Sequence, residues 1–287
     1  MPKLTRRKFL YGGIALAAGS AALGVDGFAE SNDPHLLKVE IPLARLPLPF
    51  DGFTIVQLSD FHYEEHFSAV PIRKAVDIVN GLRPDLVALT GDFVTVPLLE
   101  RRPALLKAAE TAIPCAEILS KVTSQKVAIM GNHDAASYPK KITDALLGNH
   151  IPVLRNSSVA IERGKDRVWV AGIDDLLRGE PDLDQTLTGI PQTETTILLA
   201  HEPDFADDAA ARSIDLQLSG HSHGGQIWIP GIGAPWLPPM ARKYPRGLRR
   251  IRNLTLYTNI GIGTIRAPIR INCRPEITLI TLRAKSV

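Results

Sequence analysis

Apolar and polar positions along this chain alternate in blocks that predict a succession of short strands and helices. Short apolar runs rich in β-branched residues, typical of buried strands, cover residues 53–58, 86–90 and 126–130. Helical spacing of apolar residues covers 70–82, ending before Pro84, and 103–122, with a kink or break expected at Pro114. The first half therefore reads as alternating strands and helices from about Leu37.

The second half of the chain is richer in predicted strands. They cover residues 153–154, 159–162, 167–171, 195–200, 215–218, 255–259 and 276–282, with one helix near 204–212. We expect an α/β fold in which two sheets form a β-sandwich flanked by helices. No linker divides the chain, so residues 37–287 are expected to form one domain.

Side chains able to bind metal ions follow the ends of the predicted strands. Asp60 and His62 follow the first, Asp92 the second, and Asn132, His133 and Asp134 the third; His201 follows a later strand, and His221 and His223 share a glycine-flanked segment. Ligands bind at this edge of open α/β sheets. Side chains two apart in extended backbone point the same way, so Asp60 with His62, and His221 with His223, could each reach one centre.

The N-terminus has the pattern of an export signal over residues 1–29. Arg6 and Arg7 are followed by Lys-Phe-Leu and by a weakly apolar run that is shorter than the roughly 20 residues of a membrane span. The arginine pair resembles a twin-arginine signal, which export machinery reads on folded proteins. Cleavage after Ala29 and retention as an N-terminal anchor both remain open.

Composition and charge exclude some functions. The net charge of +3, from 33 basic and 30 acidic residues, does not favour nucleic-acid binding, and we expect no nucleic-acid partner. Cys115 and Cys273 are too few for a disulfide framework, and the sequence does not decide whether they pair.

The metal-binding segments, in their order, resemble the calcineurin-like metallophosphoesterase family. The matching motifs are Asp-x-His, Gly-Asp, Gly-Asn-His-Asp, a single His and Gly-His-x-His, and the resemblance spans roughly residues 53–282. The run Gly-His-Ser-His-Gly-Gly-Gln, with the later Asn-Ile-Gly-Ile-Gly, is similar to a branch of exported or membrane-associated bacterial phosphodiesterases.

The resemblance implies a role for each site residue. Asp60, His62 and His223 would hold one divalent ion, Asp92 would bridge, and Asn132, His201 and His221 would complete the second site. His133 would stabilise the phosphate and protonate the leaving oxygen, with Asp134 orienting it. Such an ion pair activates water to attack phosphorus, and nitrogen and oxygen ligands suit manganese, iron or zinc.

One departure from the family motifs narrows the range of expected substrates. Phosphoprotein phosphatases carry Gly-Asp-x-Val-Asp-Arg, whereas here Phe93-Val94-Thr95-Val96 follow Asp92, without the second Asp or the Arg. This favours a phosphodiesterase, foremost an exported enzyme for cell-envelope phosphodiesters or pyrophosphates, lipid-linked ones included. The alternatives are a soluble nucleotide phosphodiesterase, cyclic nucleotides included, and a non-catalytic scaffold, against which the complete ligand set argues.

The stretch from Trp236 to Arg252 suggests contact with a membrane surface. Its apolar start precedes six basic residues and holds no acidic residue, so it could be an amphiphilic platform; the simpler interpretation is a proline-rich loop with a solvated basic edge. With the signal, these features predict a periplasmic protein or one on the outer face of the cytoplasmic membrane.

Overall fold

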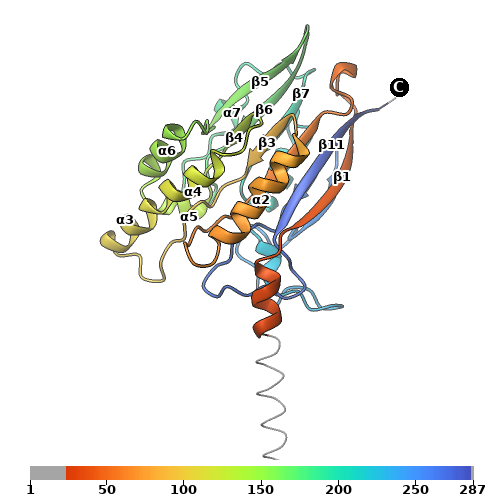
Figure 1. Ribbon diagram of the computed structural model, residues 1–287. Coiled ribbons are helices and arrows are strands. Elements are labelled where there is room, and N and C mark those ends of the chain that lie inside the picture. Colours follow the sequence, from red (N-terminus) through yellow and green to blue (C-terminus); the bar gives the residue numbers. More distant parts are fainter. Residues whose placement is uncertain (1–23, 286–287) are drawn as a thin grey trace, which may run out of the picture.

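Two mixed β-sheets packed against each other form the centre of the computed structural model, which describes residues 24–285 (Figure 1). The first sheet contains, in spatial order, β1 (His35–Leu43), β11 (Glu276–Ala284), β2 (Thr54–Leu58), β3 (Leu86–Leu89) and β4 (Lys126–Ala128). The second contains β5 (Ser157–Arg163), β6 (Asp166–Gly172), β7 (Thr195–Leu199), β8 (Leu216–Ser219), β10 (Leu254–Thr258) and β9 (Gly247–Ile251).

Both sheets have a parallel centre and an antiparallel element. Strands β2, β3 and β4 are parallel, and β11 runs antiparallel to β2 but parallel to β1. In the second sheet β6, β7, β8 and β10 are parallel, while β5 and β9 are antiparallel edge strands. The expected α/β architecture of two sheets flanked by helices is confirmed.

The helices of the first half cover the outer face of the first sheet (Figure 1). They are α2 (Ala69–Leu82), α3 (Arg102–Glu110), α4 (Ala112–Leu119), α5 (Asn132–Ala136) and α6 (Pro139–Gly148). The second half adds α7 (Leu183–Thr186), α8 (Ala206–Ala209) and the 3-10 turns η2 (Pro203–Phe205) and η3 (His223–Gly225); η1 (Leu48–Phe50) precedes β2, and residues 24–31 are also helical. Within residues 24–285, no helix is both long and apolar enough to cross a bilayer.

Strand β3 is wholly apolar, and β2 is apolar apart from Thr54 and the buried Gln57, because both faces of these strands are buried. In β2, Ile55 belongs to the core between the sheets, whereas Val56 and Leu58 belong to the core under the helices. This arrangement holds the carboxyl ends of the strands at one edge, where the chemically capable residues follow.

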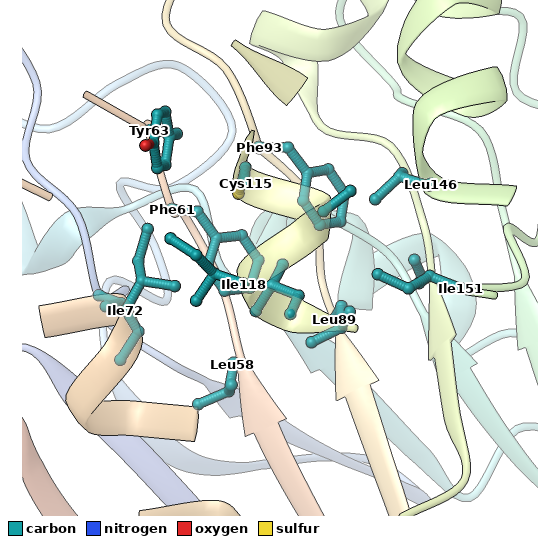
Figure 2. Packing of buried hydrophobic residues seen from close by; sticks show 14 of the residues in the cluster. Leu58, Phe61, Tyr63, Ile72, Leu89, Phe93, Cys115, Ile118, Leu146 and Ile151 are labelled. Carbon is teal, nitrogen blue, oxygen red and sulfur yellow. The ribbon is translucent and has the colours of Figure 1, made fainter. Parts of the chain in front are cut away.

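Phe61 and Phe93 fix two of the segments that follow these strands (Figure 2). Both side chains are fully buried, and their rings stack with centroids 5.1 Å apart. Phe61 stands between Asp60 and His62, and Phe93 follows Asp92. The core therefore sets the position of three candidate metal ligands.

The structure differs from the expected elements in a few places. The helix break lies at Thr111, and Pro114 occupies the first turn of α4, where its missing N–H costs no hydrogen bond. Residues 153–154 form only an isolated bridge, through Val153, and the helix near 204–212 is shortened to η2 and α8. Cys115 and Cys273 are both buried free thiols.

Candidate metal centre

The predicted ligands gather into two groups with Asp92 between them. The ligand atoms of Asp60, His62 and His223 lie within 4.8 Å of one another, and so do those of Asp92, His201 and His221. Asp92 Oδ2 lies 3.4 Å from His62 Nε2 and 3.2 Å from His201 Nε2. This geometry places one carboxylate where it can serve both groups.

Asn132 and His133 stand beside these groups at the start of α5. The His133 backbone N–H donates to Asp92 Oδ1 at 2.9 Å, and the His133 and His62 rings meet edge to face with centroids 4.6 Å apart. The side-chain Oδ1 of Asn132 is buried and accepts no hydrogen bond from the described residues.

The backbone at the ligands is left-handed, which corrects the expectation of extended segments. The angle φ is 54° at Asp60, 41° at His62, 58° at Asp92, 66° at His221 and 50° at His223. Such angles are uncommon outside glycine, although Asp and His tolerate them better than most residues, and they cluster at functional sites. Asp60 and His62 do converge, but through turns instead of strand alternation.

His221 and His223 do not share one centre, contrary to the spacing argument. His223 Nε2 lies 3.1 Å from Asp60 Oδ1 and 3.0 Å from His62 Nε2, in the first group. The His221 ring faces that of His201 in the second group, with centroids 5.1 Å apart. Because the left-handed residues turn the chain between them, the two imidazoles diverge.

Backbone carbonyls determine which nitrogen carries the proton in two of the histidines. His201 Nδ1 lies 2.6 Å from the Thr90 carbonyl oxygen, and His221 Nε2 lies 2.9 Å from that of Pro239. A carbonyl oxygen only accepts, so these nitrogens donate, and the lone pairs of the neutral rings are His201 Nε2 and His221 Nδ1. Metal-bound histidines commonly have their second nitrogen fixed in this way.

The residues present fit a pair of divalent cations. His201 Nε2 is buried without a hydrogen-bond partner among the described residues, and it faces the Asp92 carboxylate. Burial disfavours protonation of His201, yet the carboxylates of Asp92 and Asp60 raise its pKa well above the usual range. A cation between these groups would satisfy the same carboxylates, and the thiolate-free donor set suits manganese, iron or zinc.

His133 has the opposite tautomer from the one a ligand would need at Nε2. Its Nδ1 accepts a hydrogen bond of 2.8 Å from the Val96 backbone N–H, so the neutral ring carries its proton on Nε2. Burial lowers the pKa of His133 to about 4, which keeps the ring neutral at pH 7. His133 is therefore arranged to donate a hydrogen bond.

Asp134 does not orient the His133 ring, and that expectation is wrong. Its carboxylate accepts hydrogen bonds from the backbone N–H groups of Asp92 at 2.8 Å, Phe93 at 2.9 Å, Gly131 at 3.0 Å and Val94 at 3.2 Å. Burial and the charge of Asp92 raise its pKa to about 8. Asp134 joins the segments after β3 and β4, and the orienting partner of His133 is Val96.

Sequence reasoning missed the residues that support the ligands. Thr95 Oγ1 lies 3.2 Å from His62 Nδ1. The Thr90 and Pro239 carbonyls accept hydrogen bonds from His201 and His221, respectively. The guanidinium of Arg270 is fully buried, with Nη2 3.5 Å from His223 Nδ1. The available signal was an arginine within an otherwise apolar stretch, Ile269-Arg270-Ile271.

The structure divides the stretch from Trp236 to Arg252 into two parts. Trp236 lies in a loop of residues 226–240 that leaves η3 and returns at Pro239 to His221, so this loop borders the site. The basic residues Arg249 and Arg250 lie on β9, which pairs with β10 and runs away from the site edge toward Arg252. Arg249 and Arg250 therefore lie apart from the apolar loop, whereas the Arg246 guanidinium lies over the Trp228 ring of that loop, 4.4 Å from the ring centroid.

Comparison with known proteins supports the interpretation of the site as a metal centre. Residues 53–225 match the family model described as calcineurin-like phosphoesterase. The chain is 34% identical over 294 residues to the uncharacterized metallophosphoesterase YkuE of Bacillus subtilis, covering 99% of each chain. It is 29% identical over 285 residues to phosphodiesterase YaeI of Escherichia coli, covering 97% of this chain and 99% of that protein.

A vertebrate relative is a longer protein. This chain is 33% identical to the transmembrane protein with metallophosphoesterase domain of Danio rerio, covering 92% of this chain but 61% of that protein. The extent of the family match and the full-length similarity to YkuE decide the classification. The chain belongs to the calcineurin-like phosphoesterase family and is a metal-dependent phosphoester hydrolase.

Proposed function

We propose that this member of the calcineurin-like phosphoesterase family is an exported phosphodiesterase that hydrolyses phosphodiesters or pyrophosphates of the cell envelope, lipid-linked ones included. The observation that carries the proposal is the pairing of two metal-ligand groups around Asp92 with a neutral histidine that presents an N–H beside them. This combination supplies positive charge for an anionic ester and a proton for a leaving oxygen.

The proposed ligand roles follow the two groups. Asp60, His62 and His223 would hold one ion and His201, Asn132 and His221 the other, with Asp92 shared between them. Bound divalent ions would polarise the phosphate and activate a water for attack on phosphorus. The Oδ1 of Asn132, which accepts no hydrogen bond from residues 24–285, supports its inclusion, because a buried amide oxygen without a donor is costly.

His133 would deliver the proton from Nε2 to the leaving oxygen. The Val96 N–H keeps Nδ1 as an acceptor, so Nε2 holds the proton in the neutral ring. Asp92 fixes the same residue from its other side by accepting the His133 backbone N–H. The ring is thus positioned by two segments, those after β3 and β4.

A diester fits this site better than a phosphomonoester dianion. The positions that hold Asp and Arg in phosphoprotein phosphatases are Thr95 and Val96 here, and their polar groups bind His62 and His133. Arg270 is fully buried and directs its donors to backbone carbonyls, so it offers no clamp to a substrate.

The surroundings of the site support an envelope substrate. Ile232 and Trp236, on the loop that borders the site, are 79% and 64% exposed. Exposed apolar side chains beside an active site suit a substrate that lies in or near a lipid surface. The arginine pair Arg6-Arg7 supports twin-arginine export to the periplasm or the outer face of the cytoplasmic membrane.

A substrate panel with the purified, metal-loaded protein tests the proposal. We expect turnover of bis(4-nitrophenyl) phosphate to exceed that of 4-nitrophenyl phosphate by at least about tenfold, because Thr95 and Val96 supply no arginine clamp for a dianion. Lipid-linked diesters in mixed micelles are then compared with cyclic and linear nucleotide diesters. Preference for monoesters would refute the phosphodiesterase, and preference for nucleotides would refute the envelope substrate alone.

A replacement of both Arg6 and Arg7 by lysine tests export separately. Lysine keeps the charge but lacks the guanidinium fork, so a receptor that reads arginine should reject it. We expect the variant to accumulate inside cells that export the parent chain. Unchanged export would remove the twin-arginine route and leave the chemistry of the site unaffected.

A further inference from the structure

The helix formed by residues 24–31 packs against the body of the enzyme through one face. Gly27, Glu30 and Ser31, spaced three and four apart, make the contacts. The Gly27 carbonyl accepts a 3.0 Å hydrogen bond from the Arg270 N–H, and a Cβ at Gly27 would lie 2.6 Å from Ile269 Cγ2. Only glycine permits so close an approach.

The side chain of Glu30 holds the loop of residues 268–274 by binding backbone N–H groups of that loop. One carboxylate oxygen accepts the Asn272 N–H at 3.0 Å and the other accepts the Cys273 N–H at 2.5 Å. Ser31 Oγ lies 3.1 Å from the Pro268 carbonyl, and Asp33 forms an ion pair with Arg274. The first ten described residues are thus tied to a segment some 240 residues further along the chain.

The same loop contributes the buried Arg270. Its guanidinium donates to the carbonyls of Ile260 at 3.0 Å, Gly263 at 2.6 Å and Cys273 at 3.0 Å, besides its contact with His223. Burial lowers the pKa of Arg270. A buried cation with carbonyl acceptors depends on those carbonyls staying in place, so the position of this loop matters energetically.

Residues 260–263 in turn support Asp60. The Gly263 N–H donates to the Asp60 carbonyl at 2.7 Å, and a Cβ at Gly261 would lie 2.6 Å from Asp60 Cβ. An unbroken series of contacts therefore runs from the helix of residues 24–31, through Arg270, to Asp60 and His223. Both of these residues belong to the first metal group.

We infer that residues 24–33 remain in the functional enzyme as a docking helix that positions the first metal group through Arg270. Cleavage after Ala29 would remove Gly27 and place a new N-terminus at Glu30, next to the loop that Glu30 holds. The helix also ends the segment that carries the export signal, and in Figure 1 it lies at the same end of the molecule as the loops after the strands. Retention therefore keeps the domain joined to the apolar run at its N-terminus. The role of this run as a tether depends on the export proposed above.

The mass of the mature protein tests retention directly. We expect the intact mass, confirmed by N-terminal peptide mapping of protein purified from the membrane fraction, to include residues 24–30. A mature chain that begins at Glu30 or later and binds Mn²⁺ as tightly as the full-length chain would overturn the inference. This measurement is independent of substrate, so its failure is distinct from failure of the proposed function.

Point variants of the full chain test the coupling to the metal group. Gly27→Val and Glu30→Ala should each weaken Mn²⁺ binding about tenfold, the lower end of what loss of a ligand's supporting contacts causes. Glu30→Gln, which keeps one acceptor oxygen, should lie between Glu30→Ala and the parent. Val25→Ser, at a position 72% exposed on the same helix, is the matched control and should bind Mn²⁺ normally.

Calorimetric Mn²⁺ titration and the thermal midpoint are the measurements. A weakened affinity in both contact variants, with Val25→Ser unchanged, supports the inference. Parent-like Mn²⁺ affinity in Gly27→Val and Glu30→Ala overturns it, even if the thermal midpoint falls, because the helix would then stabilise the fold without positioning the ligands.

Discussion

The hydrogen bonds at His133, His201 and His221 assign each ring nitrogen to donating or accepting. In their neutral forms His201 and His221 donate a ring N–H to a carbonyl oxygen and present a lone pair to the site. His133 accepts a hydrogen bond from the Val96 N–H at Nδ1 and presents its Nε2–H instead. Three rings of the same chemical type are therefore prepared for two different tasks by backbone groups alone.

Replacing His133 by alanine should remove catalysis but not the metals. His133 lies close enough to His62 and Asp92 to share an ion with them, but its Nδ1 accepts from Val96 and its Nε2 carries the proton, so the neutral ring offers no free lone pair to a metal ion. We expect turnover of diesters with poor leaving groups to fall about 10²–10⁴-fold, and turnover of 4-nitrophenyl esters to fall less. Metal analysis beside kcat measures both properties. His150→Asn, at an exposed position with φ of 58°, is the control, and loss of metal from His133→Ala would contradict the assigned role.

Glu276 should make the stability of the protein decrease as the pH rises. Burial raises the pKa of this carboxyl above its ordinary 4.5, although hydrogen bonds from Thr278 and Tyr257 oppose the shift. Above pH 4.5 the unfolded chain releases the proton while the folded chain retains it, so folding becomes less favourable until the folded-state pKa is passed.

Glu276→Gln removes this titration while keeping an acceptor for Tyr257. The free energy of unfolding of the variant, relative to the parent, should therefore increase with pH above about 4.5. Urea unfolding of both proteins at a series of pH values provides the measurement. Parallel stability curves would show that Glu276 titrates alike in the folded and unfolded chains.

The sequence predicted which side chains gather at the candidate metal centre, but not the backbone geometry that brings them together. Asp60, Asp92 and His201 all stand just after apolar strands, a pattern visible in one dimension. The role of Asp134 was misassigned because its four partners are backbone N–H groups. Nearly every residue type has such a group, so the sequence does not show which ones Asp134 binds. The left-handed backbone at His221 and His223 is hidden for the same reason.

At the scale of elements, the segments after β2 and β3 are held by one aromatic pair. Phe61 and Phe93 stack under the helices (Figure 2). Their neighbours Asp60, His62 and Asp92 belong to the candidate metal groups. The apolar core and the metal centre therefore share the same short turns. A substitution that loosens the core packing at these turns should also weaken metal binding.

Phe61→Ala should lower both stability and metal affinity. Loss of a fully buried ring costs about 3–5 kcal/mol of unfolding free energy, and the freed turn should weaken Mn²⁺ binding about tenfold. Phe50→Ala is the matched control, because Phe50 is equally buried but lies between the sheets, near the start of β2. Chemical unfolding and Mn²⁺ titration separate the effects. Equal Mn²⁺ affinity in the two variants would mean that the turn keeps its shape without the ring.

Most strands and the helix α2 followed from periodicity, whereas the strands β1 and β9 and the helix α6 did not. Apolar runs located β2, β3 and β7 within a residue or two, because strands buried on both faces carry mostly apolar side chains. Strand β9 was missed because its exposed arginines resemble a solvated loop. Its position is set by pairing with β10, a contact between segments that sequence periodicity does not report.

At the scale of the molecule, exposed apolar side chains near the site should matter only when substrate is presented on a surface. Replacing Ile232 and Trp236 together by serine should lower turnover of a vesicle-bound diester at least about tenfold, because apolar contact with the interface is lost. Turnover of bis(4-nitrophenyl) phosphate in solution should not change. Leu48→Ser, 81% exposed on η1 at the opposite end of β2, is the control. Equal losses on both substrates would rule out a surface role.

The order of strands in the first sheet also constrains when this protein can fold. Strand β1 pairs only with β11 among the described strands, and β11 separates it from β2. His35 pairs with Glu276, far along the chain, so on the ribosome β1 has no neighbour among the described strands until β11 has emerged. The sheet that carries Asp60 and Asp92 therefore gains its first strand only after β11 has been synthesised, although β2, β3 and β4 can pair with one another earlier.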